Sequence, residues 1–217
     1  ESDLSAVGAM FEAVRDVTHE AARDVKLLAA TNTARLESNN KSSNVGLGVT
    51  VGFGQQNGIS FQIAASQVKG KTSGSETTYD NTRVTAGETL SVKSGGDTTL
   101  KGAQAGGKRI EADIGGKLVI ETLQDRSDYK SKQTSSGFSL SLCIPPICYG
   151  MSSGSISASQ QKISHSYQSA VGQSGLAAGS GGFDIEVKGE TRLKGAAITS
   201  EAPEDKNRLA TQSLSYE

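Results

Sequence analysis

Aromatic residues, proline and cysteine are scarce in this chain of 217 residues. Phe, Tyr and Trp make up 5% of it, Trp is absent, and there are three Pro and two Cys. Hydrophobic residues are 35%, and they approach the roughly 45–50% of ordinary globular domains only when Gly, which fills no core, is counted. The chain has instead 30 Ser, 17 Thr and 26 Gly. This composition argues against a compact enzyme and favours an elongated fold with a thin, repetitive core.

The chain also lacks a surplus of either charge and any long apolar run. Lys and Arg number 22 against 23 Asp and Glu, for a net charge of −1. Nucleic-acid-binding proteins carry a basic excess, so we expect no nucleic-acid partner. No stretch of 18 apolar residues occurs, and the sequence therefore predicts no transmembrane helix.

The first 23 residues differ from the rest of the chain in their apolar spacing. Leu4, Val7, Phe11 and Val14 recur at intervals of three and four among good helix formers. This spacing predicts an amphipathic helix over residues 3–22, which makes residues 1–23 a helical lead-in segment. The competing interpretation is that a strand already begins at Val25.

Strict alternation of apolar and small residues begins after residue 41. Val45, Leu47, Val49, Val51 and Phe53 occupy every second position, and a second alternating run starts at Ile59 after the turn sequence Gln55-Gln-Asn-Gly58. Asn-Gly is a strong hairpin turn signal. We therefore expect a hairpin at residues 44–66 and a related one at residues 137–159.

A repeat of 20 residues follows the first of these hairpins. Leu90, Leu100, Ile110 and Ile120 are spaced by ten, and Gly residues separate the short strands. A short strand every ten residues and a full cycle every 20 are typical of a β-solenoid. The sequence thus predicts an all-β right-handed parallel β-helix with two hairpin extensions over residues 24–217. A longer repeat divides it into two units of about 90 residues, at about 41–131 and 132–217.

The two cysteines flank Ile144-Pro-Pro-Ile147. Because Pro cannot extend a strand ladder, we expect Pro145-Pro146 to form the tip of the second hairpin and to bring Cys143 and Cys148 together. An exported protein would join them in a disulfide. A redox pair and two free thiols are the alternatives.

Catalytic, cofactor-binding and metal-binding sites are not predicted. His19 and His165 stand in unrelated contexts, and we interpret both as surface residues without a ligand role. A carbohydrate-active β-helix enzyme would need clustered charges. Six charged residues are candidates for one shared face, which we interpret as a solvated face: Asp97, Lys101, Glu111, Asp113, Lys117 and Glu121.

The two apolar hairpins are the most informative feature for function. Each must bury its apolar side, either against the flank of the solenoid or against a partner or a membrane. The candidate contact surface consists of Val49, Val51, Phe53, Ile59, Phe61, Phe138, Leu140, Leu142, Ile144, Ile147 and Tyr149.

An ordered set of motifs carries a family resemblance over roughly residues 24–217. They include Asn39-Asn-Lys-Ser-Ser-Asn-Val-Gly-Leu-Gly48, Thr77-Thr-Tyr-Asp-Asn-Thr82, Ser94-Gly-Gly-Asp-Thr-Thr-Leu-Lys-Gly-Ala103, Leu118-Val-Ile-Glu-Thr-Leu-Gln-Asp125, Tyr129-Lys-Ser-Lys-Gln133, Leu142-Cys-Ile-Pro-Pro-Ile-Cys-Tyr149 and Gly181-Gly-Phe-Asp-Ile185. Together they resemble the haemagglutinin repeat of two-partner-secretion exoproteins. More narrowly, they resemble the second filamentous-haemagglutinin repeat region of CdiA-type contact-dependent growth inhibition proteins.

The resemblance implies a secreted protein of the bacterial cell surface, exported by an outer-membrane secretion partner of the parent protein. It implies a non-catalytic segment that binds the target-cell outer membrane, or a receptor on that surface, and helps to deliver a toxin. The alternative is a host-cell adhesin or haemagglutinin shaft, acting as a binding or spacer module. No cofactor is implied.

Overall fold

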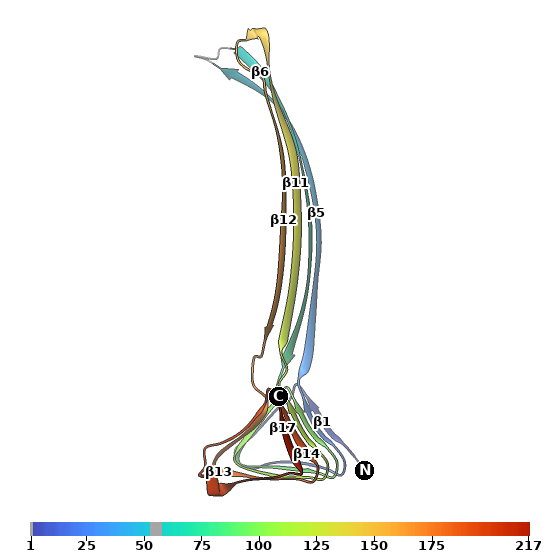
Figure 1. Cartoon of the computed structure of the whole chain (residues 1–217), viewed down its shortest axis with the longest axis vertical. Helices are drawn as coiled ribbons and strands as arrows, with labels where there is room; N and C mark the ends of the chain where they lie inside the picture. The colour runs from blue at the N-terminus through green and yellow to red at the C-terminus, as the bar shows by residue number, and fades with distance from the viewer. Residues whose placement is uncertain (1, 53–57) are drawn as a thin grey trace. The chain divides into compact units, whose positions relative to one another are not determined.

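The computed structural model describes residues 2–52 and 58–217, and nearly all of this part of the chain is β-structure (Figure 1). Packing divides the chain into two compact units. The solenoid unit comprises residues 1–33, 77–126 and 168–217, and the hairpin unit comprises residues 34–76 and 127–167. This division is separate from the predicted sequence repeat at 41–131 and 132–217, which stays a prediction.

Two parallel sheets form the solenoid unit. One has six strands in the order β1 (Leu4–Val7), β4 (Val25–Leu28), β8 (Thr98–Lys101), β10 (Leu118–Glu121), β14 (Glu190–Lys194) and β17 (Ser213–Tyr216). The other has seven strands: β15 (Ala197–Ser200), β13 (Gly175–Val187), β9 (Ala103–Ile114), β7 (Thr82–Ser94) and β2 (Met10–Ala13) in that order, with β16 (Asn207–Ala210) beside β13 and β3 (Val17–Ala21) beside β7. A short 3-10 helix, η1, spans Glu204–Lys206.

The register confirms the predicted 20-residue coil. Leu90 lies beside Ile110 in the β7–β9 pair, and Leu100 lies beside Ile120 in the β8–β10 pair. All four side chains are almost completely buried. Each residue of the repeat therefore stacks on its equivalent one coil away, and inward Leu, Ile and Val form the thin core that the composition predicted. The fold is all-β, built from parallel coils and hairpins.

The predicted helix over residues 3–22, and with it the helical lead-in 1–23, is wrong. This stretch forms the strands β1, β2 and β3, and β1 pairs with β4 of the next coil. Within each short strand the inward residues are two positions apart, and a corner follows each strand. Apolar residues on the strands and at the corners together give intervals of three and four, which are the same as those of a helix. Val7 and Val14, two members of the supposed helical stripe, are 56% and 92% exposed. Pairing with the next coil therefore overrides local helix propensity.

Two kinds of corner alternate along the six-stranded sheet, at the point where each strand ends. Gly8, Gly102 and Gly195 have φ of 56°, 62° and 57° and follow β1, β8 and β14. After β4 and β10, which lie between them in the six-stranded sheet, the chain instead continues into the long strands β5 and β11. A left-handed glycine thus closes the short coils, and a hairpin replaces that corner in the coils between them.

Gly102→Ala tests the corner. Its φ is unfavourable for a Cβ, which would also lie 2.6 Å from the Cβ of Ala29 and 2.9 Å from Leu123. We expect a loss of at least about 1–2 kcal/mol in the free energy of unfolding, measured by denaturant titration. Gly46→Ala is the control, because its Cβ would meet only the Ala64 carbonyl oxygen at 4.0 Å. Equal effects of the two substitutions would contradict the corner role.

His19 is buried, which corrects its interpretation as a surface residue. It is 5% exposed and lies edge-to-face against Phe11, with ring centroids 5.1 Å apart. Its Nε2 is buried and has no hydrogen-bond partner in the described part of the chain. Burial therefore holds the pKa of His19 below its ordinary value. His165 is exposed.

This burial predicts a loss of stability in acid. The folded-state pKa lies below the unfolded value of about 6.5, so the unfolded chain binds more protons as the pH falls. The contribution of neutral His19 is complete above about pH 6.5 and decreases as the pH falls below it. Unfolding midpoints measured from pH 7 to pH 5 should fall more steeply for the unaltered chain than for His19→Leu. Parallel curves for His19→Leu and the unaltered chain would contradict the prediction.

Candidate functional site

The hairpin unit is a single four-stranded sheet. Its order is β12 (Ser153–Ser169), β11 (Asp125–Cys148), β6 (Gly58–Asp80) and β5 (Ala30–Gly52), and Figure 1 shows these long strands side by side. The predicted hairpins at 44–66 and 137–159 are confirmed, although both are longer than expected. The turn predicted at residues 55–57 lies outside the described residues, and Gly58 begins β6.

Side-chain pairs define the antiparallel register of this sheet. Ser135 and Ser139 of β11 pair with Ser159 and Ser155 of β12, with Oγ–Oγ distances of 2.7 and 2.8 Å. Thr72 of β6 pairs with Ser131 of β11, with hydroxyl oxygens 3.2 Å apart. On the other side of β6, Gly48 lies beside Gln62 and Gly70 beside Asn40. These pairs fix which residues share a face, because side chains alternate along a strand.

The register gathers the large apolar side chains on one face of the sheet. Val49 lies opposite Phe61, Val51 opposite Ile59, and Ile63 of β6 opposite Leu140 of β11. We call this set the apolar patch, and it comprises Val45, Leu47, Val49, Val51, Ile59, Phe61, Ile63, Ala65, Phe138, Leu140, Leu142, Ile144 and Ile156. The opposite glycine–serine face carries small and polar residues at the same level, among them Gly46, Gly48, Gln62, Ala64, Gly137, Ser139, Ser155 and Ser157.

Much of the apolar patch is exposed to solvent. Leu47 is 80% exposed, Val49 61% and Phe138 49%. Among the described residues of the hairpin unit, Cys148 alone is buried. The sheet is thus a single layer, and the described part of this unit holds no second layer that covers the patch.

A groove crosses the patch from one edge strand to the other. Its volume is about 570 Å³, and its apolar lining comes from Val45, Ala65, Phe138, Ile156 and Ala158. The small Ala side chains between larger neighbours leave room for an apolar group. Ser43, Gln67 and Ser136 border it on one side.

The structure brings together most of the predicted contact residues. Eight of them lie on the apolar face: Val49, Val51, Ile59, Phe61, Phe138, Leu140, Leu142 and Ile144. Ile147 and Tyr149 are exposed at the tip, and Phe53 lies outside the described residues. The set omitted Val45, Leu47, Ile63 and Ile156, although the alternation of apolar residues already marks the first three. Their role as a contact surface stays a prediction.

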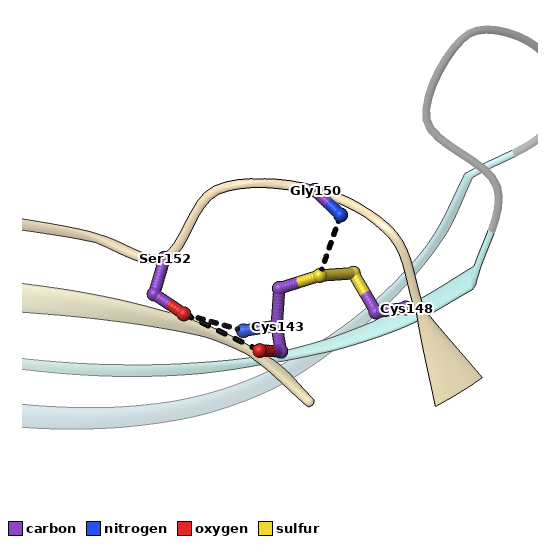
Figure 2. Close-up of a disulfide and its surroundings, with 4 residues drawn as sticks. All are labelled: Cys143, Cys148, Gly150 and Ser152. Atoms are coloured by element: carbon purple, nitrogen blue, oxygen red, sulfur yellow. Dashed lines mark hydrogen bonds between the residues drawn. A yellow bond between two sulfur atoms is a disulfide. The ribbon is translucent and has the colours of Figure 1, made fainter. Parts of the chain in front are cut away.

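A disulfide joins Cys143 to Cys148 at the end of β11, with their Cα atoms 5.2 Å apart (Figure 2). The Gly150 N–H donates to the Cys143 Sγ over 2.9 Å, and the Cys143 N–H donates to the Ser152 Oγ over 3.0 Å. The chain turns between the two cysteines, because a continuous strand would place their Cα atoms about 17 Å apart and not 5.2 Å. Pro145-Pro146 lies in this turn, as expected, and residues 149–152 complete the connection to β12.

Replacing both cysteines by serine tests whether the disulfide orders this tip. The closed loop is short, and the chain-entropy relation gives a loss of about 2 kcal/mol. We therefore expect faster amide hydrogen exchange in residues 138–156, while the solenoid residues 98–121 keep their protection. The same result is expected for the unaltered chain under reducing conditions. Unchanged exchange in 138–156 would show that the tip does not depend on the bond.

The charged residues considered for an enzyme do not form one cluster. Lys101 and Glu121 lie on the six-stranded sheet, with 3.1 Å between Nζ and Oε2, whereas Glu111 and Asp113 lie on β9 of the other sheet. Lys117 pairs with Glu190 at 2.9 Å. This hydrogen bond and charge raise the pKa of Lys117 and lower that of Glu190. Each group is therefore held in its charged form, which suits an ion pair and not a proton-transfer couple.

Parallel coils of about 20 residues define the chain as a β-solenoid repeat protein. The family model for the hemagglutinin repeat matches residues 1–136, and the chain belongs to this family. This membership confirms the resemblance and the expectation of a secreted exoprotein of the cell surface.

Curated relatives narrow the resemblance to CdiA proteins. The chain is 40% identical over 218 residues to "Deoxyribonuclease CdiA" of Dickeya dadantii (strain 3937), covering 100% of this chain and 6% of that protein. It is 39% identical over 215 residues to "tRNA nuclease CdiA" of Escherichia coli (strain NC101), covering 99% and 6%. It is 37% identical over 214 residues to "Deoxyribonuclease CdiA" of Yersinia pseudotuberculosis serotype O:3 (strain YPIII), covering 99% and 19%.

The chain thus spans 6–19% of the length of these three relatives, and their nuclease names describe the whole proteins. No solved structure matches the chain significantly. Within the described residues, no helix has the length and apolar character needed to span a membrane.

Proposed function

We propose that this chain is a non-catalytic delivery segment of a contact-dependent growth inhibition effector, and that its apolar patch binds the outer membrane of the target cell. The similarity to CdiA proteins over 99–100% of the chain supports this context. The parent protein then reaches the cell surface through an outer-membrane secretion partner, and the segment supports delivery of the toxin.

The exposed apolar patch is the observation that carries the proposal. Exposed apolar patches larger than a few hundred Å² mark interaction sites on soluble proteins. Strands are about 4.8 Å apart and rise about 3.4 Å per residue, so seven residues on four strands cover on the order of 450 Å². A surface of this size on a single-layer sheet needs a partner to remove it from water. The acyl region of a membrane provides an apolar environment without requiring a matching protein surface.

The proposal predicts that polar substitutions in the patch abolish binding to outer-membrane vesicles of Gram-negative bacteria. We expect the triple variant Val49→Gln, Phe61→Gln and Leu140→Gln to lower the partition coefficient about a hundredfold. Each side chain contributes about 1 kcal/mol when its remaining exposed area is buried. Vesicle co-sedimentation of the labelled chain measures the effect.

The matched control places the same substitutions on the opposite face. Leu36, Tyr129 and Ile163 lie on the glycine–serine face and are 53%, 37% and 45% exposed, close to the 61%, 42% and 37% of the test residues. Their triple glutamine variant should bind as the unaltered chain does, and circular dichroism should show the same fold for both variants. Equal binding by all three proteins, or binding to animal cells only, would refute the proposal and leave an adhesin or spacer role.

A further inference from the structure

The face that carries the apolar patch also carries a cluster of lysines, farther along the same strands. On each strand the lysines are an even number of positions from the patch residues, so both point to the same face of the sheet. A row containing Ser43, Gln67 and Ser136 separates the lysines from the patch. We call the set the lysine belt, and it comprises Lys41, Lys69, Lys71, Lys130, Lys132 and Lys162.

The register places several of these lysines directly opposite one another. The Thr72–Ser131 pair puts the neighbouring Lys71 opposite Lys132. The Ser135–Ser159 pair, three residues further on, puts Lys132 opposite Lys162. Lys69 lies opposite Lys41, next to the Gly70–Asn40 contact. Every strand of the sheet therefore contributes a cation to the belt.

The belt carries an excess of positive charge, with two carboxylates at one end of it. Glu37 lies in the same row as Lys130, and Asp128 lies two residues from Lys130 on β11. All six side chains are exposed, and none forms a salt bridge or a side-chain hydrogen bond with another described residue. Residues 34–76 and 127–167 contain seven Lys and Arg against three Asp and Glu, whereas the solenoid unit contains fifteen against twenty. The near-neutral chain thus separates its charge between the two units.

Edge protection does not explain the belt. Lysines on edge strands discourage pairing with other chains, and this accounts for Lys41 on β5 and Lys162 on β12. The other four lysines lie on the inner strands β6 and β11. Like charges directly opposite each other destabilise a sheet, so the pair of Lys71 and Lys132 weakens the fold unless an anion binds there.

The combination of belt and patch selects the ligand chemistry. Lys41 and Val45 are four positions apart, about 14 Å along an extended strand. A face that carries apolar side chains beside lysines suits a membrane boundary. The apolar side chains enter the acyl layer, and the lysines lie at the anionic headgroups. A nucleic acid or another polyanion would use the lysines and leave the apolar patch in water.

We propose that this face docks on an anionic lipid surface, with the lysine belt binding the phosphate groups of lipid headgroups while the apolar patch enters the acyl layer. The inference rests on the proposed function and names the chemistry that its membrane must present. It predicts a preference for anionic over zwitterionic bilayers and a loss of binding at high salt, which screens these charges.

The test uses vesicles of phosphatidylcholine, alone or mixed with phosphatidylglycerol, and the full chain. We expect the mixed vesicles to bind more strongly and Lys69→Gln/Lys71→Gln/Lys132→Gln to lower that binding on the order of a hundredfold, since each lysine near an anionic surface contributes severalfold. The control is Lys93→Gln/Lys188→Gln/Lys206→Gln in the solenoid unit, which removes the same charge. These three lysines are exposed and form no side-chain ion pair or hydrogen bond among the described residues. The control should bind as the unaltered chain does.

Three outcomes would overturn the inference: equal binding to both vesicle types, equal losses in the two triple variants, or a belt effect seen with duplex DNA and absent with vesicles. The two proposals fail separately. Binding to bacterial outer-membrane vesicles that is insensitive to the belt variant refutes the inference and leaves the proposed function. Belt-dependent binding to anionic vesicles without binding to outer-membrane vesicles supports the inference and refutes the proposed function.

Discussion

The parallel backbone ladder between successive coils is the constraint on which the rest of the structure depends. Each coil of about 20 residues stacks on the next at the strand spacing of about 4.8 Å. The two hairpins replace a glycine corner after β4 and β10, which are two coils apart. Each hairpin contributes two strands, and β6 of the first hairpin pairs with β11 of the second in one sheet.

The two units obey different rules of burial. In the solenoid unit, the inward side chains Leu27, Leu100 and Ile120 stack and are almost fully buried, so a small number of apolar residues suffices for a continuous core. The hairpin unit is held by backbone pairing, small cross-strand contacts such as Ser139–Ser155, and one disulfide. Its large apolar side chains are left on the surface. An apolar surface that the fold does not bury is available for binding, and in this chain it lies on the hairpin sheet.

Local sequence reasoning succeeded where one residue type repeats in a fixed register and failed where short strands meet corners. The ten-residue spacing of Leu90, Leu100, Ile110 and Ile120 survives unchanged as stacked pairs. In the first 23 residues, the corners near Gly8 and Val14 break the alternation, and the remaining apolar spacing matches a helix as well as it matches three strands. Pairing with β4 and β7 selects the strands over the helix. The residues paired with β4 are 21 positions from their partners, and those paired with β7 are 73 positions from theirs.

The sequence by itself determined the coil length, the two hairpins and most of the apolar contact residues, because each depends on periodicity within a short stretch. It also brought the two cysteines within reach of each other through their short separation. Tertiary structure alone decided that the two hairpins share one sheet, and that the apolar patch and the lysine belt lie on the same face of it. The β6–β11 register controls both, since a shift by one residue would move every side chain of one hairpin to the opposite face. The two strands of this pair belong to different hairpins, and the facing residues Thr72 and Ser131 are 59 positions apart, so no local pattern encodes the register.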